Sequence, residues 1–325
     1  MKEYFPVTHS TLSIQALITN VLPNYNLGSF VEGELISCNM NDTYYVEADN
    51  GNKYILRVYR YNWRTLDDIL DELDVLLYLK SQRLAVSVPL PKQDGSYITS
   101  VNAPEGERYI VLFSYVPGEE LTYEAEEKDS YLYGEMVANI HTATEEYISC
   151  HQRFALDLDY LLNLPLKNIQ HRLKKQPELR QFLINVADRL QKQLIALPLE
   201  NLEWGYCHGD FHGWNAHLQE DGTLIAYDFD CGGMGWRAYD LAVFRWGARF
   251  RRREKERWND FLEGYQSIRQ IDSLDLKATL YFVALRHFWF LGVYAANGQD
   301  WGFSSLKWYF AESQKFLSDL EQEYL

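Results

Sequence analysis

The sequence predicts an α+β protein with a small antiparallel β-rich N-terminal lobe and a larger, mainly helical C-terminal lobe. Three observations predict it. Residues 30–113 show strand-like alternation around one helix, residues 131–324 show mainly helical periodicity, and one short β island interrupts the helical part at residues 215–227. We place the division after residue 116, so the lobes are residues 1–116 and 117–325.

The N-terminal lobe begins with an amphipathic helix, which we expect from Ser10 to Leu22 because Pro23 stops it. A meander follows, in which Asp49-Asn50-Gly51-Asn52 is the turn of a hairpin. Thr65 and Asp68 predict the capped start of a helix that ends near Lys80. The five expected strands are Phe30–Ser37, Thr43–Ala48, Lys53–Tyr59, Ser96–Ser100 and Tyr109–Phe113.

The C-terminal lobe is helical except for the β island, a hairpin whose turn is Glu220-Asp221-Gly222. Its aromatic-rich stretch from Tyr281 to Tyr294 suits a buried core helix better than a cage for a cationic ligand. The expected helices are Tyr131–Thr142, Pro177–Ala196, Arg237–Phe250, Glu254–Tyr265, Leu276–Ala296 and Ser305–Tyr324.

Composition excludes several classes of function. The formal charge of −15, from 31 basic and 46 acidic residues, disfavours nucleic acid as a partner. The sequence contains no stretch of about 18 uncharged apolar residues, so no membrane span is predicted. The four cysteines show no C-x-x-C pair or metal-ligand spacing and are expected as free thiols. We therefore expect a soluble cytoplasmic protein without a membrane partner.

One run of residues carries the chemistry. In HGDFHGWN, Asp210 and Asn215 have the D-x-x-x-x-N spacing of a kinase catalytic loop, and an Asp-Phe pair follows at Asp228. The hairpin between them can bring the three side chains together. Carboxylate and amide oxygens are the ligands that Mg²⁺ prefers, and a transferring phosphoryl group needs such neutralisation. The run therefore predicts a phosphotransferase that uses ATP and Mg²⁺.

Three neighbouring residues leave alternatives open. Asp230 is either an additional metal ligand or a polar neighbour of the site. His212 and His217 raise the possibility of zinc, but the oxygen ligands beside them favour Mg²⁺, so we interpret both as loop contacts.

At these residues the chain resembles a known family, the aminoglycoside phosphotransferase and choline kinase-like enzymes of the protein-kinase-like fold. Within it, the nearest resemblance is to the bacterial homoserine-kinase-type and stress-response-kinase-like branch. The segments that carry it, in order, are YILRV, VLFSYVPGEEL, GEMVANIHT, HGDFHGWN and YDFDCGGMGWRAYDLA.

The resemblance implies roles for individual residues of the C-terminal lobe. Asp210 would be the catalytic base, and His208 would support its loop. Asn215 and Asp228 would hold Mg²⁺, and Asp240 would brace the loop without touching substrate.

For the N-terminal lobe the resemblance implies a nucleotide site. Arg57 stands where many relatives carry a lysine that contacts the phosphates, and Glu72 would be its helix partner. A guanidinium differs from an ammonium in geometry, so phosphate binding departs from the family pattern here. Thr43 would lie in the loop that covers the phosphates, and the hinge beside the purine would be Phe113, Ser114, Tyr115 and Val116.

Three functions remain open from the sequence. The first is an ATP- and Mg²⁺-dependent phosphotransferase whose acceptor is a hydroxyl of a small metabolite, such as an amino alcohol, a sugar or an aminoglycoside. The second is a serine/threonine protein kinase of the stress-response type, and the third is a nucleotide-binding protein without catalysis. Arg286 and His287 would reach the acceptor if their helix lines the site. The sequence leaves the acceptor and the oligomeric state undetermined.

Overall fold

The chain divides into two compact units, each of which is described by itself. The computed structural model describes residues 5–121, 127–298 and 306–324. The first unit comprises Met1–Pro117 and Ser149–Gln152, and the second comprises Gly118–Ile148 and Arg153–Leu325.

The first unit is built on a five-stranded antiparallel sheet with the strand order β1-β2-β3-β5-β4. All neighbouring strands are antiparallel, and the β2–β3 hairpin uses the expected turn at residues 49–52. The strands are β1 Phe30–Cys38, β2 Asn41–Ala48, β3 Lys53–Tyr59, β4 Ile98–Ala103 and β5 Gly106–Ser114. The expectation of an antiparallel N-terminal sheet is confirmed.

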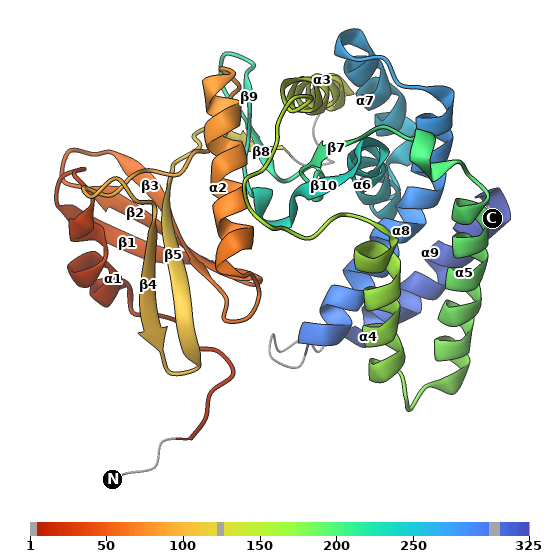
Figure 1. Ribbon diagram of the computed structural model, residues 1–325, viewed down its shortest axis with the longest axis horizontal. Helices are drawn as coiled ribbons and strands as arrows, with labels where there is room; N and C mark the ends of the chain where they lie inside the picture. The colour runs from red at the N-terminus through yellow and green to blue at the C-terminus, as the bar shows by residue number, and fades with distance from the viewer. Residues whose placement is uncertain (1–4, 122–126, 299–305, 325) are drawn as a thin grey trace. The chain divides into compact units, whose positions relative to one another are not determined.

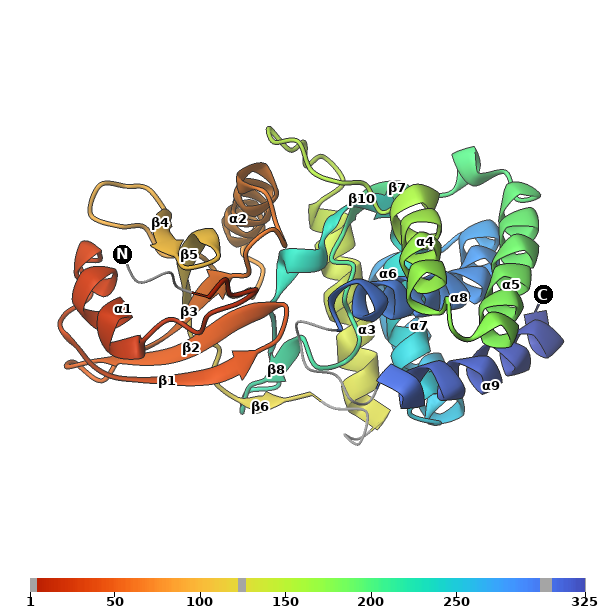
Figure 2. The ribbon, with the colours of Figure 1, turned by 90° about the horizontal axis from the view of Figure 1, so that it is seen from below.

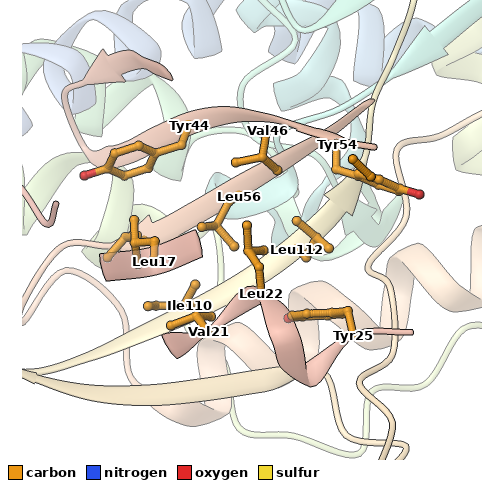
Figure 3. Packing of buried hydrophobic residues seen from close by; sticks show 12 residues of the cluster. Leu17, Val21, Leu22, Tyr25, Tyr44, Val46, Tyr54, Leu56, Ile110 and Leu112 are labelled. Carbon is orange, nitrogen blue, oxygen red and sulfur yellow. The ribbon is translucent and has the colours of Figure 1, made fainter. Parts of the chain in front are cut away.

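Helix α1 (Ile14–Asn20) and the short turn that follows it cover one face of this sheet (Figure 3). Alternate residues of β3 and β5 point to that face, and Leu56, Ile110 and Leu112 are fully buried there. Leu17 and Leu22 pack onto them from the helical segment. The first core of the molecule therefore lies between α1 and the sheet.

Helix α2 (Leu66–Ser81) belongs to the same unit and contacts the β3 residues that point to the other face of the sheet, such as Arg57. Its start has the predicted capping box. The Thr65 hydroxyl accepts from the Asp68 amide at 3.1 Å, and the Asp68 carboxylate accepts from the Thr65 amide at 2.9 Å. The cap fixes where the helix begins and hence where Glu72 stands on it.

The second unit is mainly helical, as expected. Figures 1 and 2 show α4, α5 and α9 gathered around α8, while α6 packs against α8 and α3 packs against α7. The helices are α3 Glu127–Ala143, α4 Leu164–Arg172, α5 Pro177–Ile195, α6 Arg237–Phe250, α7 Glu254–Ile268, α8 Ser273–Asn297 and α9 Leu306–Tyr324. Ser305, where we expected the last helix to begin, lies outside the described residues.

Helix α8 is apolar nearly all round and is the central helix of this unit. Phe282 and Phe288 are completely buried and Trp289 is 3 % exposed, which confirms the interpretation of this aromatic stretch as core. None of the described helices combines the length and the apolarity needed to cross a bilayer.

Two small sheets interrupt the helices. Strands β7 (Trp204–Cys207) and β10 (Gly233–Trp236) form an antiparallel pair. Strands β8 (Ala216–Leu218) and β9 (Leu224–Ala226) form the predicted hairpin, and the two-residue strand β6 (Glu119–Glu120) pairs with β8. The loop of residues 208–215 connects β7 to β8, and residues 227–232 connect β9 to β10.

Sequence periodicity missed several of these elements. Helix α4 and the π-helical turn before it (Asp159–Asn163) were not expected, nor was the β7–β10 pair. Strands of four residues carry too few alternating positions for recognition, and β10 is half glycine.

Candidate active site

The loop of residues 208–215 makes a sharp turn directly after β7. Gly209 has a φ of +76°, in the left-handed region that favours glycine. A side chain at this position would place its Cβ 2.3 Å from the carbonyl oxygen of Cys231, which belongs to the neighbouring connection. The glycine of the H-G-D triplet is therefore required by both the backbone conformation and the close approach.

Asp240 of α6 anchors the start of this loop. Its carboxylate accepts from the backbone amide of His208 at 2.8 Å and from that of Gly209 at 2.7 Å. It also lies 3.0 Å from Nε2 of His141 on α3, and Nδ1 of that ring lies 3.0 Å from the Tyr265 hydroxyl. Asp240 and His141 are completely buried. The expectation that Asp240 braces this loop is confirmed by these contacts.

His208 is a positioning residue in this structure. Nε2 lies 3.0 Å from the carbonyl oxygen of Tyr227 and therefore donates, which leaves Nδ1 as the acceptor for the Asp210 amide at 3.2 Å. The ring stacks on Phe211, with centroids 4.0 Å apart. Burial lowers the pKa of His208, so the ring is neutral. Both nitrogens hold backbone, which agrees with the expected role of supporting the loop.

Asp210 receives contacts from three directions. Arg286 of α8 donates to its Oδ1 and, through a second nitrogen, to the Gly209 carbonyl oxygen at 3.1 Å. Nε2 of His212 lies 3.3 Å from Oδ2. The Asn215 amide nitrogen lies 2.9 Å from the Asp210 carbonyl oxygen and 3.3 Å from Oδ2. The carboxylate is thus held in one orientation, with its side chain 13 % exposed.

The same contacts keep Asp210 ionised. Burial raises the pKa of this carboxyl, but the His212 ring and the Arg286 guanidinium lower it by more, so the pKa lies below its ordinary value. Asp210 is therefore an oriented carboxylate and a weak base at neutral pH.

Asp228 lies beside this loop. The Tyr227 amide donates to the Asn215 carbonyl oxygen at 3.0 Å, and His208 experiences the charges of both Asp210 and Asp228. The backbone of Asp228 is left-handed, with φ 65° and ψ 58°, a conformation that costs about 1–3 kcal/mol in a residue other than glycine. Asp228 therefore lies close to the loop that carries Asp210 and Asn215.

Asp230 follows in the short 3-10 turn Phe229–Cys231 and is 3 % exposed. Arg153 holds this turn by donating to the Asp230 carbonyl oxygen at 2.6 Å and to that of Phe229 at 3.3 Å. His217 stands on β8 with its ring 5.0 Å from that of Tyr227, in agreement with its interpretation as a loop contact.

The N-terminal residues predicted to bind nucleotide lie in the first unit. Arg57 of β3 forms the expected ion pair with Glu72 of α2, with Nη1 2.7 Å from Oε1. The Tyr59 hydroxyl donates to the other carboxylate oxygen at 2.8 Å. Arg57 also lies over the Phe113 ring, 5.0 Å from its centroid. The ion pair is confirmed, and Arg57 is held by a carboxylate and a ring.

Thr43 and the expected hinge are placed by the sheet. Thr43 is the cross-strand partner of Arg57, so both side chains point to the same face. Ser114 makes two hydrogen bonds with the backbone of Val88. Its amide donates to the Val88 carbonyl oxygen at 2.9 Å, and its hydroxyl accepts from the Val88 amide at 3.0 Å. Phe113 and Val116 are buried, and Tyr115 is 36 % exposed.

Sequence reasoning missed three residues that shape the site. The sequence pattern gives no role to His141 or Arg153, and it predicts for Arg286 only a contact with the acceptor, on the condition that its helix lines the site. Each belongs to an element distant in sequence from the loop that it contacts. The signal available was the histidine in GEMVANIHT and the charge inside the apolar stretch of α8, because a buried charged residue requires a partner.

A family model described as "Phosphotransferase enzyme family" matches residues 37–272, which include the 208–215 loop and Asp228. The chain belongs to this family. An uncharacterised protein of Deinococcus radiodurans is 37 % identical over 325 residues, covering 98 % of this chain and 93 % of that protein.

Two solved phosphotransferases have the same fold. An amicoumacin kinase, solved in complex with AMP-PNP, Ca²⁺ and Ami, superimposes with a TM-score of 0.77 and 20 % identity over 95 % of this chain and 94 % of its own. A microcompartment-associated aminopropanol kinase gives a TM-score of 0.73 and 23 % identity over 94 % of this chain and 97 % of its own. The expected protein-kinase-like α+β fold is confirmed.

Proposed function

We propose that this phosphotransferase transfers the γ-phosphoryl group of ATP, with Mg²⁺, to a hydroxyl group of a small molecule. The observation that carries the proposal is the Asp210 carboxylate, which Arg286, His212 and Asn215 hold ionised and oriented on a loop anchored by Asp240. A fixed carboxylate of this kind suits the orientation of an attacking hydroxyl.

In the proposed reaction, the acceptor hydroxyl donates a hydrogen bond to Asp210. Its oxygen forms a bond to the γ-phosphorus while the bond from that phosphorus to the β–γ bridging oxygen breaks, so ADP leaves. Because the pKa of Asp210 is low, the proton moves to Asp210 late, when bonding to phosphorus has made the hydroxyl more acidic. The proton then passes to solvent.

Asn215 and Asp228 are the proposed metal ligands. Their donors are amide and carboxylate oxygens, which fit Mg²⁺, and the Asn215 amide nitrogen already bonds within the loop, which leaves its oxygen for the metal. Asp230 is a candidate third ligand. The metal ion would supply positive charge to the phosphoryl oxygens.

For the nucleotide, we propose that Arg57 contacts the phosphates while Glu72 fixes its guanidinium, and that Thr43 adds a polar contact on the same face. The purine would lie beside residues 113–116. Since the groups of Ser114 that contact Val88 are already used, its neighbours Tyr115 and Val116 would supply the contacts to the base.

The two solved relatives support different parts of the proposal. One is named as an aminopropanol kinase, which favours a small acceptor. The amicoumacin kinase was solved with an analogue of ATP and a divalent cation, which favours the use of ATP with a metal ion. An amino alcohol, a sugar or an aminoglycoside would present the required hydroxyl.

The test is phosphoryl transfer from ATP to a panel of amino alcohols, sugars, aminoglycosides and a generic protein, followed by mass spectrometry with and without Mg²⁺. We expect a phosphorylated small molecule only with Mg²⁺ present. Phosphorylation of the protein alone would replace this proposal with a protein kinase. A thermal shift with MgATP but no product from any acceptor would indicate a nucleotide-binding protein without catalysis.

A further inference from the structure

Three potential metal ligands from separate segments meet at the end of the β1–β2 hairpin in the first unit. Cys38 and Asp42 are cross-strand partners there, and His9 approaches them from the N-terminal segment. Nε2 of His9 lies 3.5 Å from Sγ of Cys38 and 3.1 Å from Oδ1 of Asp42. The three atoms all lie within 4.8 Å of one another.

We propose that His9, Cys38 and Asp42 form a zinc-binding site, with an imidazole nitrogen, a thiolate and a carboxylate oxygen as ligands and a water at the fourth position. Nitrogen, sulfur and oxygen ligands together are a donor set that Zn²⁺ accepts, whereas Mg²⁺ and Ca²⁺ require oxygen. This site does not depend on the proposed function, because none of its three residues is proposed to bind the nucleotide, Mg²⁺ or the acceptor, although Asp42 directly precedes Thr43.

The separations fit tetrahedral zinc. Zn–N and Zn–O bonds of about 2.1 Å place a nitrogen and an oxygen ligand about 3.4 Å apart, and a Zn–S bond of about 2.3 Å places nitrogen and sulfur about 3.6 Å apart. The observed distances of 3.1 and 3.5 Å differ from these by a few tenths of an ångström. The third pair, Sγ of Cys38 and the carboxylate oxygen of Asp42, lies within 4.8 Å, so side-chain rotation has to complete the site.

Asp42 supplies a second observation, independent of the spacing. Its side chain is completely buried, and Oδ2 is taken by Arg108 at 2.9 Å. Oδ1 faces the His9 ring but has no hydrogen-bond partner of proper geometry among the described residues. A buried acceptor without a hydrogen bond is unfavourable, and a metal ion at this point would remove that cost.

The backbone beside His9 is already ordered. The Ser10 hydroxyl donates to Glu105 at 2.6 Å, and the Ser10 carbonyl oxygen accepts from Arg108 at 2.7 Å. The Leu12 carbonyl oxygen accepts from the Tyr44 hydroxyl at 2.7 Å. Because the segment is fixed directly after His9, less entropy remains to be lost when His9 becomes a ligand.

The surrounding charges permit a cation. Asp42 and Glu105 are negative near the His9 ring, and Arg60 and Arg108 are positive, so these four charges cancel. Cys38 loses its proton to solvent when the metal–sulfur bond forms, and the resulting thiolate makes the cluster negative before the ion's charge is counted.

A second cluster of potential metal ligands, His141, Cys207 and Asp240, has similar spacing. The histidine and the aspartate of this cluster already use their hydrogen-bonding atoms. Asp240 accepts from two loop amides and from His141, and the other ring nitrogen of His141 meets the Tyr265 hydroxyl. Metal binding there would break these contacts, so the hairpin site is the one that we assign.

The experiment is a titration of the full chain, freed of any histidine tag and stripped with a chelator. Zn²⁺ is titrated against a chromophoric chelator, and Co²⁺ is added to a second sample, because a cobalt–thiolate bond absorbs in the near ultraviolet. We expect one equivalent of Zn²⁺ and a charge-transfer band with Co²⁺.

Two cysteine variants make the matched pair, since both thiols are exposed. We expect Cys38→Ser to abolish the cobalt band and Cys150→Ser to retain it. His9→Gln should weaken zinc binding by more than about tenfold, the scale of loss that follows even from removing a partner of a zinc ligand.

Melting temperatures without metal show whether the variants fold, and those that melt like the wild-type protein are compared. A cobalt band that survives Cys38→Ser, equal zinc affinity in both cysteine variants, or no zinc retained against the chelator would each overturn the assignment.

Discussion

Arg286 contacts both the side chain of Asp210 and the backbone carbonyl oxygen of Gly209 through two nitrogens of one guanidinium. The planar group therefore ties the carboxylate to the turn that presents it. Arg286 is 3 % exposed and lies on α8, 76 positions further along the chain. The core helix of the second unit thus sets the orientation of the proposed catalytic carboxylate.

Replacing Arg286 with lysine should separate these two contacts, because an ammonium cannot span both acceptors in one plane. We expect Arg286→Lys to lower kcat by about 10- to 100-fold with a smaller effect on KM for ATP. The pKa of Asp210 should rise, so that the acid side of the kcat profile moves to higher pH. Arg180→Lys, at an exposed position of α5, is the control. An unchanged pH profile in Arg286→Lys would contradict the positioning role.

Removing the carboxylate itself should stop turnover without preventing nucleotide binding. We expect Asp210→Ala to lower kcat by about 10²- to 10⁴-fold, the usual contribution of a positioned acid or base. The thermal shift with MgATP should persist in this variant. Asp221→Ala, in the exposed turn of the β8–β9 hairpin, should keep full activity. If Asp210→Ala turns over at the wild-type rate, the role assigned here is wrong.

Asp240 should matter for stability as well as for activity. Asp240→Asn replaces a carboxylate that accepts from two loop amides and a histidine with an amide that has one acceptor oxygen. We expect a loss of about 3 kcal/mol or more in the free energy of unfolding, together with a lower kcat. Calorimetric melting checks this, with Asp188→Asn on the exposed face of α5 as the control. Equal melting of the two variants would argue against the anchor.

The ion pair of the first unit should act on the nucleotide. We expect Glu72→Ala to raise KM for ATP by about tenfold, because Arg57 and Tyr59 lose the carboxylate that fixes them. The KM for the acceptor should change less. Initial rates at varied ATP concentration measure this, and Glu34→Ala, at an exposed position of β1, is the comparison. A KM for ATP that stays at the wild-type value would remove Glu72 from the nucleotide site.

Stability should fall on the acid side because of a buried histidine. Burial lowers the pKa of His287 from 6.5 to about 3, so between these values the unfolded chain binds a proton that the folded chain does not. Stability present above pH 6.5 is therefore lost as pH falls, by about 1.4 kcal/mol per unit for this one group.

His287→Asn removes the titration but keeps an acceptor for the Trp246 indole N–H, which lies 3.1 Å from Nδ1. We expect the melting temperature of this variant to decline less than that of wild type between about pH 7 and pH 5. The exposed His171→Asn variant should keep the wild-type decline. Identical declines in all three proteins would show that His287 does not control this dependence.

Local patterns predicted much of the fold. Thr65 and Asp68 marked the start of α2 because a cap is a contact between residues three apart. The turn at residues 49–52 marked the β2–β3 hairpin for the same reason. Helix α4 and the β7–β10 pair were not predicted, since a nine-residue helix and four-residue strands contain too few turns or alternations for a period to be recognised.

In the candidate site too, the residues close together in sequence were predicted and the distant ones were not. Asp210, Asn215 and Asp228 stand close in sequence, so their spacing alone indicated the chemistry. Their supports come from elsewhere: Arg286 is on α8, His141 is on α3, and Arg153 precedes α4. No pattern in one sequence states which distant residue will meet a loop.

The sequence by itself determined the class of fold, the capped helix, the hairpins and the residues proposed to transfer a phosphoryl group. These depend on period, turn chemistry and spacing, which are properties of neighbouring residues. Only the tertiary structure decided that Arg286 orients Asp210, and that His9 meets Cys38 and Asp42. Such contacts arise when burial packs distant segments together and each buried charge must find a partner, and that pairing is settled by the whole chain.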